Sequence, residues 1–287
     1  MQLSKHHGLG NDFLVVLDEV NDRVVSVDGD LARRVCDRRT GLGADGLIHG
    51  ATPVDRSDAS VVMHLYNADG GRAETSGNGI RCLAHAVALA REVTELHLDV
   101  GTDAGPRPVV VRTRDPEGRV AWTEATMGKA LPGPEIPPAV EALLAAPGPA
   151  RAHRFATVDI GNPHLVVEVD DPGALDLAEI GPALERHFAD GINVEFVPAR
   201  DDVTAIDVPM RVWERGAGIT DACGSGACAV MAVLHEWGAA AAHDDEQRRV
   251  LHVHMPGGSA YVLLTDDGEL VLSGDVHHVA TIELPDD

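Results

Sequence analysis

Two short stretches decide how this chain folds: ETSGNGIRC at residues 74–82 and DACGSGAC at residues 221–228. Each has a small polar residue, Ser76 or Cys223, followed by Gly-x-Gly and then by an apolar run. Small residues at the start of a helix leave the first backbone N–H groups open to an anion at the positive end of the helix dipole. Both stretches therefore predict a helix that begins at an anion-binding site.

The two stretches belong to an internal duplication. GNDFLVV at residues 10–16 is matched by GNPHLVV at residues 161–167, and ADGLI at residues 44–48 by ADGIN at residues 189–193. Ser76 follows a strand that ends at Asn67, and Cys223 follows Glu214 at the same interval. Because the pairs occur in the same order with similar spacing, we predict two equivalent halves.

The pattern of each half predicts an α+β fold. The runs at residues 77–91 and 224–237 are apolar nearly all round, as expected of a helix enclosed by a sheet. Alternating runs such as RVLHVHM and SAYVLLT predict further strands. We expect two pseudo-symmetric halves, each a curled, mostly antiparallel sheet around a central apolar helix, with the site in the cleft between them. The Pro- and Ala-rich residues 131–150 are predicted to form an exposed connection.

The paired helix starts suggest a reaction. A helix start lowers the pKa of a cysteine from about 8.5, so a Cys223 thiolate is expected near neutral pH. Two such starts facing one another would hold one carboxylate and place an acid/base group on each face of the adjacent carbon. This arrangement suits inversion at an α-carbon without a cofactor.

Composition limits the remaining classes of function. The 287 residues include 46 acidic and 23 basic ones, for a net charge of −23, which disfavours nucleic-acid binding. No stretch has the length of a membrane span, and the N-terminus lacks the apolar core of a signal peptide. Four cysteines in a chain of this length do not suggest a disulfide framework. We expect a cytoplasmic protein that acts on a small molecule without contacting a membrane.

We expect structural rather than catalytic or metal-binding roles for the remaining cysteines and histidines. Cys36, Cys82 and Cys228 are expected to pack as small apolar side chains. A zinc site from Cys223, Cys228 and His235 has poor spacing, so we predict no metal. The strand histidines are expected at surface or half-buried positions rather than as metal ligands: His252, His254, His277 and His278.

The motifs of the whole chain resemble those of the diaminopimelate epimerase family. They are HGLGNDF at residues 7–13, NADG with GNGIRC within residues 67–82, GNPH at 161–164, INVEF at 192–196, and WERGAG with ACGSGACA within residues 213–229. The resemblance implies interconversion of LL- and meso-2,6-diaminopimelate, a precursor of lysine and peptidoglycan. It also implies that no pyridoxal phosphate or other cofactor is used, and that the chain forms a homodimer.

The resemblance transfers roles to individual residues. It implies four catalytic groups: Cys223 as the thiol base, Ser76 in the position of its partner thiol, and His164 and Glu214 in support. Arg215 resembles the partner of the distal carboxylate. The remaining substrate-binding residues, with Glu214 again among them, are expected to be Asn11, Asn67, Gly77, Asn78, Asn162, Asn193, Gly224 and Ser225.

Three positions depart from the family pattern. Ser76 replaces a cysteine, and a hydroxyl is a much poorer base than a thiol although it can still donate a proton. Gly46 stands where some relatives carry a side-chain ligand, and Ile219 replaces a glutamate. Ser76 is either an engineered replacement or a native member of an unequal Ser/Cys pair, and the departure at Ile219 favours the second explanation.

Two alternatives to the epimerase remain open at this stage. One is a racemase or isomerase of another amino acid on the same fold, and the other is a catalytically silent amino-acid-binding protein. The domain limits are open as well, because the repeat places the boundary within residues 131–150. The resemblance implies residues 1–120 plus 276–287 for the N-terminal half and 121–275 for the C-terminal half, and we adopt these limits.

Overall fold

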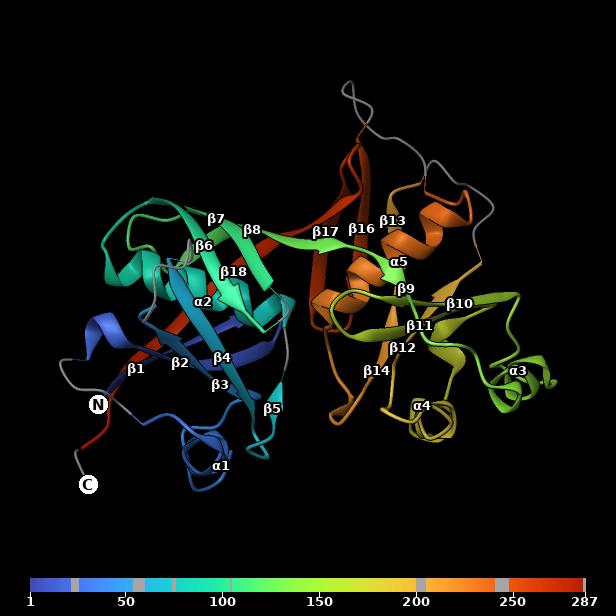
Figure 1. The fold of residues 1–287 in the computed structure, drawn as a ribbon, viewed down its shortest axis with the longest axis horizontal. Coiled ribbons are helices and arrows are strands. Elements are labelled where there is room, and N and C mark those ends of the chain that lie inside the picture. Colours follow the sequence, from blue (N-terminus) through green and yellow to red (C-terminus); the bar gives the residue numbers. More distant parts are fainter. Residues whose placement is uncertain are drawn as a thin grey trace. The chain divides into compact units, whose positions relative to one another are not determined.

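Strands packed around a buried helix occur twice in the computed structural model, once in each of two units (Figure 1). The structure describes residues 1–21, 26–53, 60–73, 76–103, 105–199, 205–240 and 248–285. Unit 1 comprises Met1–Thr126 and Ser273–Asp287, and unit 2 comprises Met127–Leu272. The division falls inside strands β8 (Val120–Lys129) and β18 (Glu269–Glu283). The domain limits at residues 120 and 275 stay a prediction.

Unit 1 is a closed barrel around helix α2 (Gly77–Ala90). Its strands pair in the order β1-β2-β3-β4-β6-β7-β8-β18, and β18 also pairs with β1, which closes the ring. The helix contacts most of the barrel strands, and all its residues from Gly77 to Ala88 are buried. The remaining elements are β1 (Gln2–Gly8), β2 (Asn11–Leu17), η1 (Asp18–Val20), α1 (Gly29–Cys36), β3 (Gly46–Ala51), β4 (Val61–Asn67), β5 (Arg72–Ala73), β6 (Glu95–Thr102) and β7 (Gly105–Thr113).

Unit 2 places helix α5 (Gly224–Glu236) against two sheets. α5 contacts β17 of one sheet and β10, β11 and β12 of the other. The elements are β9 (Leu131–Pro132), α3 (Pro138–Ala145), β10 (Arg154–Asp159), β11 (Pro163–Val169), η2 (Pro172–Ala174), α4 (Leu177–Glu185), β12 (Asn193–Pro198), β13 (Asp207–Pro209), β14 (Arg211–Glu214), β15 (Gly218–Ile219), β16 (Arg249–Met255) and β17 (Gly258–Leu264).

The duplicated motifs form equivalent elements in the two units. In unit 1, the chain runs from β2 through α1 to β3, and β2 pairs in parallel with β3. β3 then pairs antiparallel with β4. In unit 2, β11 and β12 pair in parallel on either side of α4, and β12 pairs antiparallel with β14. The predicted α+β fold, with a curled sheet and a central apolar helix in each half, is confirmed.

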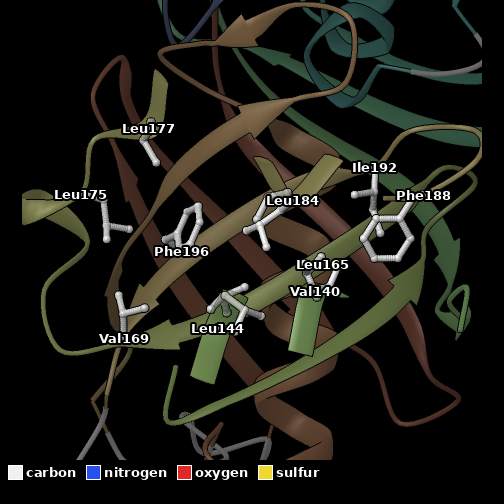
Figure 2. Packing of buried hydrophobic residues seen from close by; sticks show 12 residues of the cluster. Val140, Leu144, Leu165, Val169, Leu175, Leu177, Leu184, Phe188, Ile192 and Phe196 are labelled. Carbon is white, nitrogen blue, oxygen red and sulfur yellow. The ribbon is translucent and has the colours of Figure 1, made fainter. Parts of the chain in front are cut away.

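The predicted exposed connection at residues 131–150 is partly wrong. Leu131 is exposed, but the stretch then forms α3, whose Val140 and Leu144 are fully buried. Both side chains pack into an apolar cluster with residues such as Leu165 and Phe196 (Figure 2). Pro138 is the first residue of α3, a position where the backbone N–H that proline lacks would have no partner within the helix. The stretch is therefore part of the core of unit 2.

Candidate active site

Helix α2 begins at Ser76, as the sequence predicts. The Ser76 side chain accepts a hydrogen bond from the Gly79 N–H at 3.0 Å and so caps the first turn. Gly77 is the first helical residue and is buried. A Cβ at Gly79 would lie only 3.1 Å from the Ser76 Cβ, so the glycine lets the cap close over the helix. The half-buried hydroxyl thus stands at the positive end of the buried helix.

Asn78 and Asn11 lie in one hydrogen-bond network beside this helix start. The Asn78 Nδ2 donates to Asn11 Oδ1 at 3.2 Å, and Asn11 Nδ2 donates to Asp45 Oδ2 at 2.9 Å. The buried Arg81 guanidinium donates to Asn78 Oδ1 at 2.6 Å. Asp45 and Arg81 fix the orientation of both amides, and neither was among the predicted site residues.

Asn67 and Gly46 meet at neighbouring strand ends. They are direct partners in the β3–β4 pairing, and the Asn67 side chain is exposed. A Cβ at Gly46 would lie 2.8 Å from the Tyr66 carbonyl oxygen and 3.2 Å from the Phe13 ring. A side-chain ligand at position 46 therefore does not fit this backbone.

Helix α5 begins at Cys223 in the same way that α2 begins at Ser76. The Cys223 Sγ accepts from the Gly226 N–H at 3.3 Å and lies 3.5 Å from the Ser225 Oγ. Its own N–H points to the Met255 Sδ at 3.4 Å. Gly224 and Ser225 form the buried first turn. Cys223 is 4 % exposed, so its thiol is almost fully buried at the start of the helix.

The expected lowering of the Cys223 pKa is wrong for this structure. Burial raises the pKa of the thiol well above its ordinary value, and the Glu214 and Glu195 carboxylates raise it further. Hydrogen bonds from Ser225 and the Gly226 backbone lower it, but these are the weaker effects. A helix start favours a thiolate only when desolvation and nearby negative charge do not exceed its field.

Glu214 is the carboxylate that faces the thiol. Burial raises the pKa of the Glu214 carboxyl, and hydrogen bonds from Thr220 and Cys223 offset part of the rise. Thr220 Oγ1 donates a short hydrogen bond to Glu214 Oε1. A carboxylate hydrogen-bonded to a thiol is a candidate acceptor for its proton.

His164 is held by a second buried carboxylate. Its Nδ1 lies 2.7 Å from the Glu195 Oε1, both side chains are fully buried, and its Nε2 lies 3.0 Å from the Asn162 Oδ1. Among the described residues, none hydrogen-bonds to the other Glu195 oxygen, Oε2. A Cβ at Gly226 would lie 2.7 Å from Glu195 Oε1, so this glycine lets the carboxylate reach the start of α5.

Sequence reasoning missed Glu195, although a signal was present. Glu195 is the only charged residue of the β12 sequence NVEFVP, and every residue of β12 before the final proline is buried. A charge in an apolar strand is costly unless it is paired, so it indicates a buried partner. The partner, His164, lies on the neighbouring strand β11.

Asn193 positions the backbone of Arg215. Its Oδ1 accepts from the Arg215 N–H at 3.0 Å, and its Nδ2 donates to the Pro163 carbonyl at 3.0 Å. The Arg215 guanidinium is half-buried and donates to the Asp190 carbonyl at 3.2 Å. Asn193 thus ties β12 to the turn that carries Arg215.

The predicted residues form two groups, one in each unit. Unit 1 gathers Ser76, Gly77, Asn78 and Asn11, with Asn67 at the end of β4. Unit 2 gathers Cys223, Gly224, Ser225, Glu214, His164, Asn162, Asn193 and Arg215. Ile219 is 51 % exposed. Cys36, Cys82 and Cys228 are buried free thiols, as expected.

Comparison with known proteins now assigns the family. The model of the family described as diaminopimelate epimerase matches residues 3–130 and 156–279. The chain belongs to the diaminopimelate epimerase family. A diaminopimelate epimerase from Synechococcus elongatus is 38 % identical over 286 residues, covering 96 % of this chain and 94 % of the relative. One from Desulforudis audaxviator is 39 % identical, with 97 % of each chain covered.

Solved structures similar to this member of the diaminopimelate epimerase family share its fold. A predicted epimerase from Pseudomonas aeruginosa superposes with a TM-score of 0.71 at 20 % identity, covering 100 % of this chain and 99 % of the other. A hydroxyproline epimerase from Agrobacterium vitis superposes with a TM-score of 0.69 at 17 % identity, covering 98 % and 91 %. In the part of the chain that the structure describes, no helix has both the length and the apolar character needed to cross a membrane.

Proposed function

We propose that this chain epimerises LL-2,6-diaminopimelate to meso-diaminopimelate by a two-base reaction without a cofactor. The family of the chain supports an epimerase, which is an isomerase, and the relatives cited above carry the name diaminopimelate epimerase. The observation that carries the catalytic part of the proposal is the Cys223–Glu214 pair. The Cys223 thiol donates a hydrogen bond to Glu214, and the raised pKa of the Glu214 carboxyl makes it a better proton acceptor, although burial also raises the pKa of the thiol.

Cys223 is the proposed base. Because burial and two carboxylates hold it as a thiol, its proton must leave before it can act, and Glu214 is the acceptor. The thiolate then takes the α-proton of the substrate, and the negative charge that develops is stabilised by the N–H groups at the start of α5. His164 and Glu195 support the arrangement, since His164 is hydrogen-bonded to Glu195 next to the same helix start.

Ser76 is the proposed partner acid, delivering its hydroxyl proton to the opposite face of the α-carbon. Water then reprotonates the Ser76 alkoxide, and Glu214 releases to water the proton that it took from Cys223, which closes the cycle. The Ser76 Oγ lies at the start of α2, where helix N–H groups can bind the substrate α-carboxylate. A hydroxyl donates this proton less readily than a thiol. Ser76 therefore limits the rate of the proposed reaction.

The proposed contacts with the rest of the substrate follow from the hydrogen-bonding groups available. We assign the side-chain amides of Asn11, Asn67, Asn162 and Asn193 to the substrate ammonium and carboxylate ends, because an amide group that already makes one hydrogen bond can make a further one. Arg215 offers a guanidinium, which pairs with a distal carboxylate through two parallel hydrogen bonds. A substrate with amino-acid groups at both ends uses all of these residues.

The test measures deuterium incorporation at Cα in D₂O with LL- and meso-diaminopimelate. We expect the wild-type protein to exchange and invert both isomers, and Ser76→Cys to raise the rate by up to about 10²–10⁴-fold, the usual contribution of one acid/base group. Cys223→Ala should abolish inversion. A wild-type protein that is inert while Ser76→Cys is active would refute Ser76 as a working acid but keep the epimerase scaffold.

Substrate choice needs a separate control. The same exchange assay on a panel of free amino acids with a single ammonium and carboxylate should give much slower exchange. Arg215→Met should raise KM for diaminopimelate and leave the slow exchange of short amino acids unchanged. If a short amino acid is inverted faster than diaminopimelate, the proposed substrate is wrong.

A further inference from the structure

Two histidines and an aspartate converge on one face of unit 2, apart from the residues proposed for catalysis. His252 and His254 alternate along β16, so both side chains lie on the same face of the sheet. Asp207 on the parallel neighbour β13 is the direct partner of His252. Side chains of direct partners in neighbouring strands point to the same face of the sheet. The β13–β16 pairing therefore places Asp207 on the same face as His252 and His254.

One carboxylate oxygen lies between the two imidazoles. The Asp207 Oδ1 is 3.0 Å from the His252 Nδ1 and 2.6 Å from the His254 Nε2. One potential ligand atom from each of the three side chains lies within 4.8 Å of the other two. In tetrahedral zinc sites with bonds of about 2.0–2.1 Å, neighbouring ligand atoms are about 3.3 Å apart. The ligand atoms of this group are separated on a similar scale.

The neighbouring strand β17 orients both histidines. Tyr261, the partner of His252, stacks on its ring at 4.2 Å between centroids and 5° between planes. Ser259, the partner of His254, has its Oγ 2.8 Å from the His254 Nδ1. An imidazole that binds a metal through one nitrogen commonly has a hydrogen-bond partner at the other, which fixes its orientation. Ser259 occupies that place and leaves Nε2 of His254 directed at the group.

We propose that Asp207, His252 and His254 form a binding site for a divalent transition-metal ion of the zinc class. The His252 Nδ1, the His254 Nε2 and a carboxylate oxygen of Asp207 are its ligands, and water completes the coordination. Two imidazoles with one carboxylate suit Zn²⁺ and its neighbours in the first transition row better than Mg²⁺ or Ca²⁺, which prefer oxygen ligands. His252 and His254 are half-buried, within the expected surface or half-buried range, but the expectation that they are not metal ligands did not include Asp207, and this proposal departs from it.

The bound ion would fasten a short edge strand. β13 has only three residues, and among the strands that the structure describes it pairs only with β16. Three residues supply few backbone hydrogen bonds, whereas a metal bridging Asp207 to β16 joins the two strands directly. The site therefore adds stability to this edge of unit 2 and takes no part in the proposed epimerisation.

Zinc binding to the full-length, reduced protein provides the test, measured by competition with a chromophoric chelator. We expect one tight site per chain, and a loss of affinity of at least tenfold in Asp207→Ala and in His254→Ala, because each removes a ligand. His153→Ala is the matched control. His153 and Asp170 also form a surface pair, at 2.6 Å, but lack a second histidine. This variant should bind zinc as the wild type does.

A second measurement separates this site from the Cys223 thiol. The Co²⁺ complex should lack the thiolate charge-transfer band, and zinc should raise the thermal unfolding midpoint of the wild type but not of Asp207→Ala. Equal zinc affinity in the wild type and both ligand variants overturns the proposal. A thiolate band that disappears in Cys223→Ala would overturn it as well, because the metal would then be at the thiol.

Discussion

Replacing Glu195 with glutamine tests how the second buried carboxylate affects His164 and Cys223. The substitution keeps the shape of the side chain and an oxygen that can accept from His164, but it removes the negative charge. The two side chains are fully buried and their hydrogen bond is 2.7 Å long. The change therefore acts on one short contact and on the electric field at the start of α5.

The size of the effect follows from the difference between two kinds of hydrogen bond. A bond to a charged group contributes about 1.5–3 kcal/mol, whereas a neutral one contributes about 0.5–1.5 kcal/mol. Glu195→Gln should therefore weaken the support of His164 by about 1–1.5 kcal/mol. If this support acts in the transition state, kcat/KM for diaminopimelate falls roughly 5- to 13-fold. The same substitution removes one of the charges that raise the pKa of Cys223, so that pKa should fall.

The combination of a slower enzyme and a more acidic thiol distinguishes this role from general damage. Alkylation of Cys223 by iodoacetamide, followed by mass spectrometry across a pH series, should shift to lower pH in Glu195→Gln. Cys36, Cys82 and Cys228 are also free thiols, and peptide mapping by mass spectrometry counts their modification separately from that of Cys223. An unchanged alkylation profile, or one shifted to higher pH, would refute the reasoning.

Glu168→Gln is the matched control for the loss of a buried carboxylate in unit 2. Glu168 is 4 % exposed and pairs with Arg154 at 2.8 Å. This variant should lose some stability, yet keep the alkylation profile of Cys223 and its catalytic rate. If it changes them as much as Glu195→Gln does, the effect is not specific to His164.

Three further predictions concern stability. Leu144→Ala should lower the free energy of unfolding by about 2–5 kcal/mol in urea titration, because this fully buried side chain of α3 leaves a cavity. Gly46→Ala should cost about 1–3 kcal/mol in the same assay, since its Cβ would meet the Tyr66 carbonyl at 2.8 Å. Burial lowers the pKa of His85 to about 4. Between about pH 6.5 and pH 4, His85 is therefore protonated in the unfolded chain but neutral in the folded chain. The contribution of His85 to stability should therefore fall by about 3 kcal/mol as the pH drops from 6.5 to about 4, and the pH dependence of urea unfolding should be shallower in His85→Gln.

Local patterns predicted much of the architecture because they depend on neighbours in the chain. The caps at Ser76 and Cys223 use a backbone N–H three residues later, so the motif and its geometry lie in the same few residues. The duplication predicted equivalent elements, and the parallel pairs β2–β3 and β11–β12 confirm it. The prediction of an exposed connection at residues 131–150 was partly wrong because proline and alanine are common both in connections and at the start of a helix such as α3.

The chemistry of the candidate site was harder to predict because it depends on residues distant in the sequence. The helix start alone suggested a lowered pKa for Cys223. In the folded chain, burial raises this pKa, and Glu214 from β14 and Glu195 from β12 raise it further. In the same way, HVH at residues 252–254 resembles an ordinary alternating strand in the sequence. Only the pairing of β13 with β16 shows that Asp207 lies beside these histidines.

The sequence by itself determined the two capped helices, the repeat and the family, since hydrophobic periodicity and helix capping act over a few residues. Only the tertiary structure decided which charges are buried together and therefore how easily Cys223 loses its proton. Electrostatic energies depend on the distance between groups and on their exclusion from water, and both are set by strand pairing between distant segments.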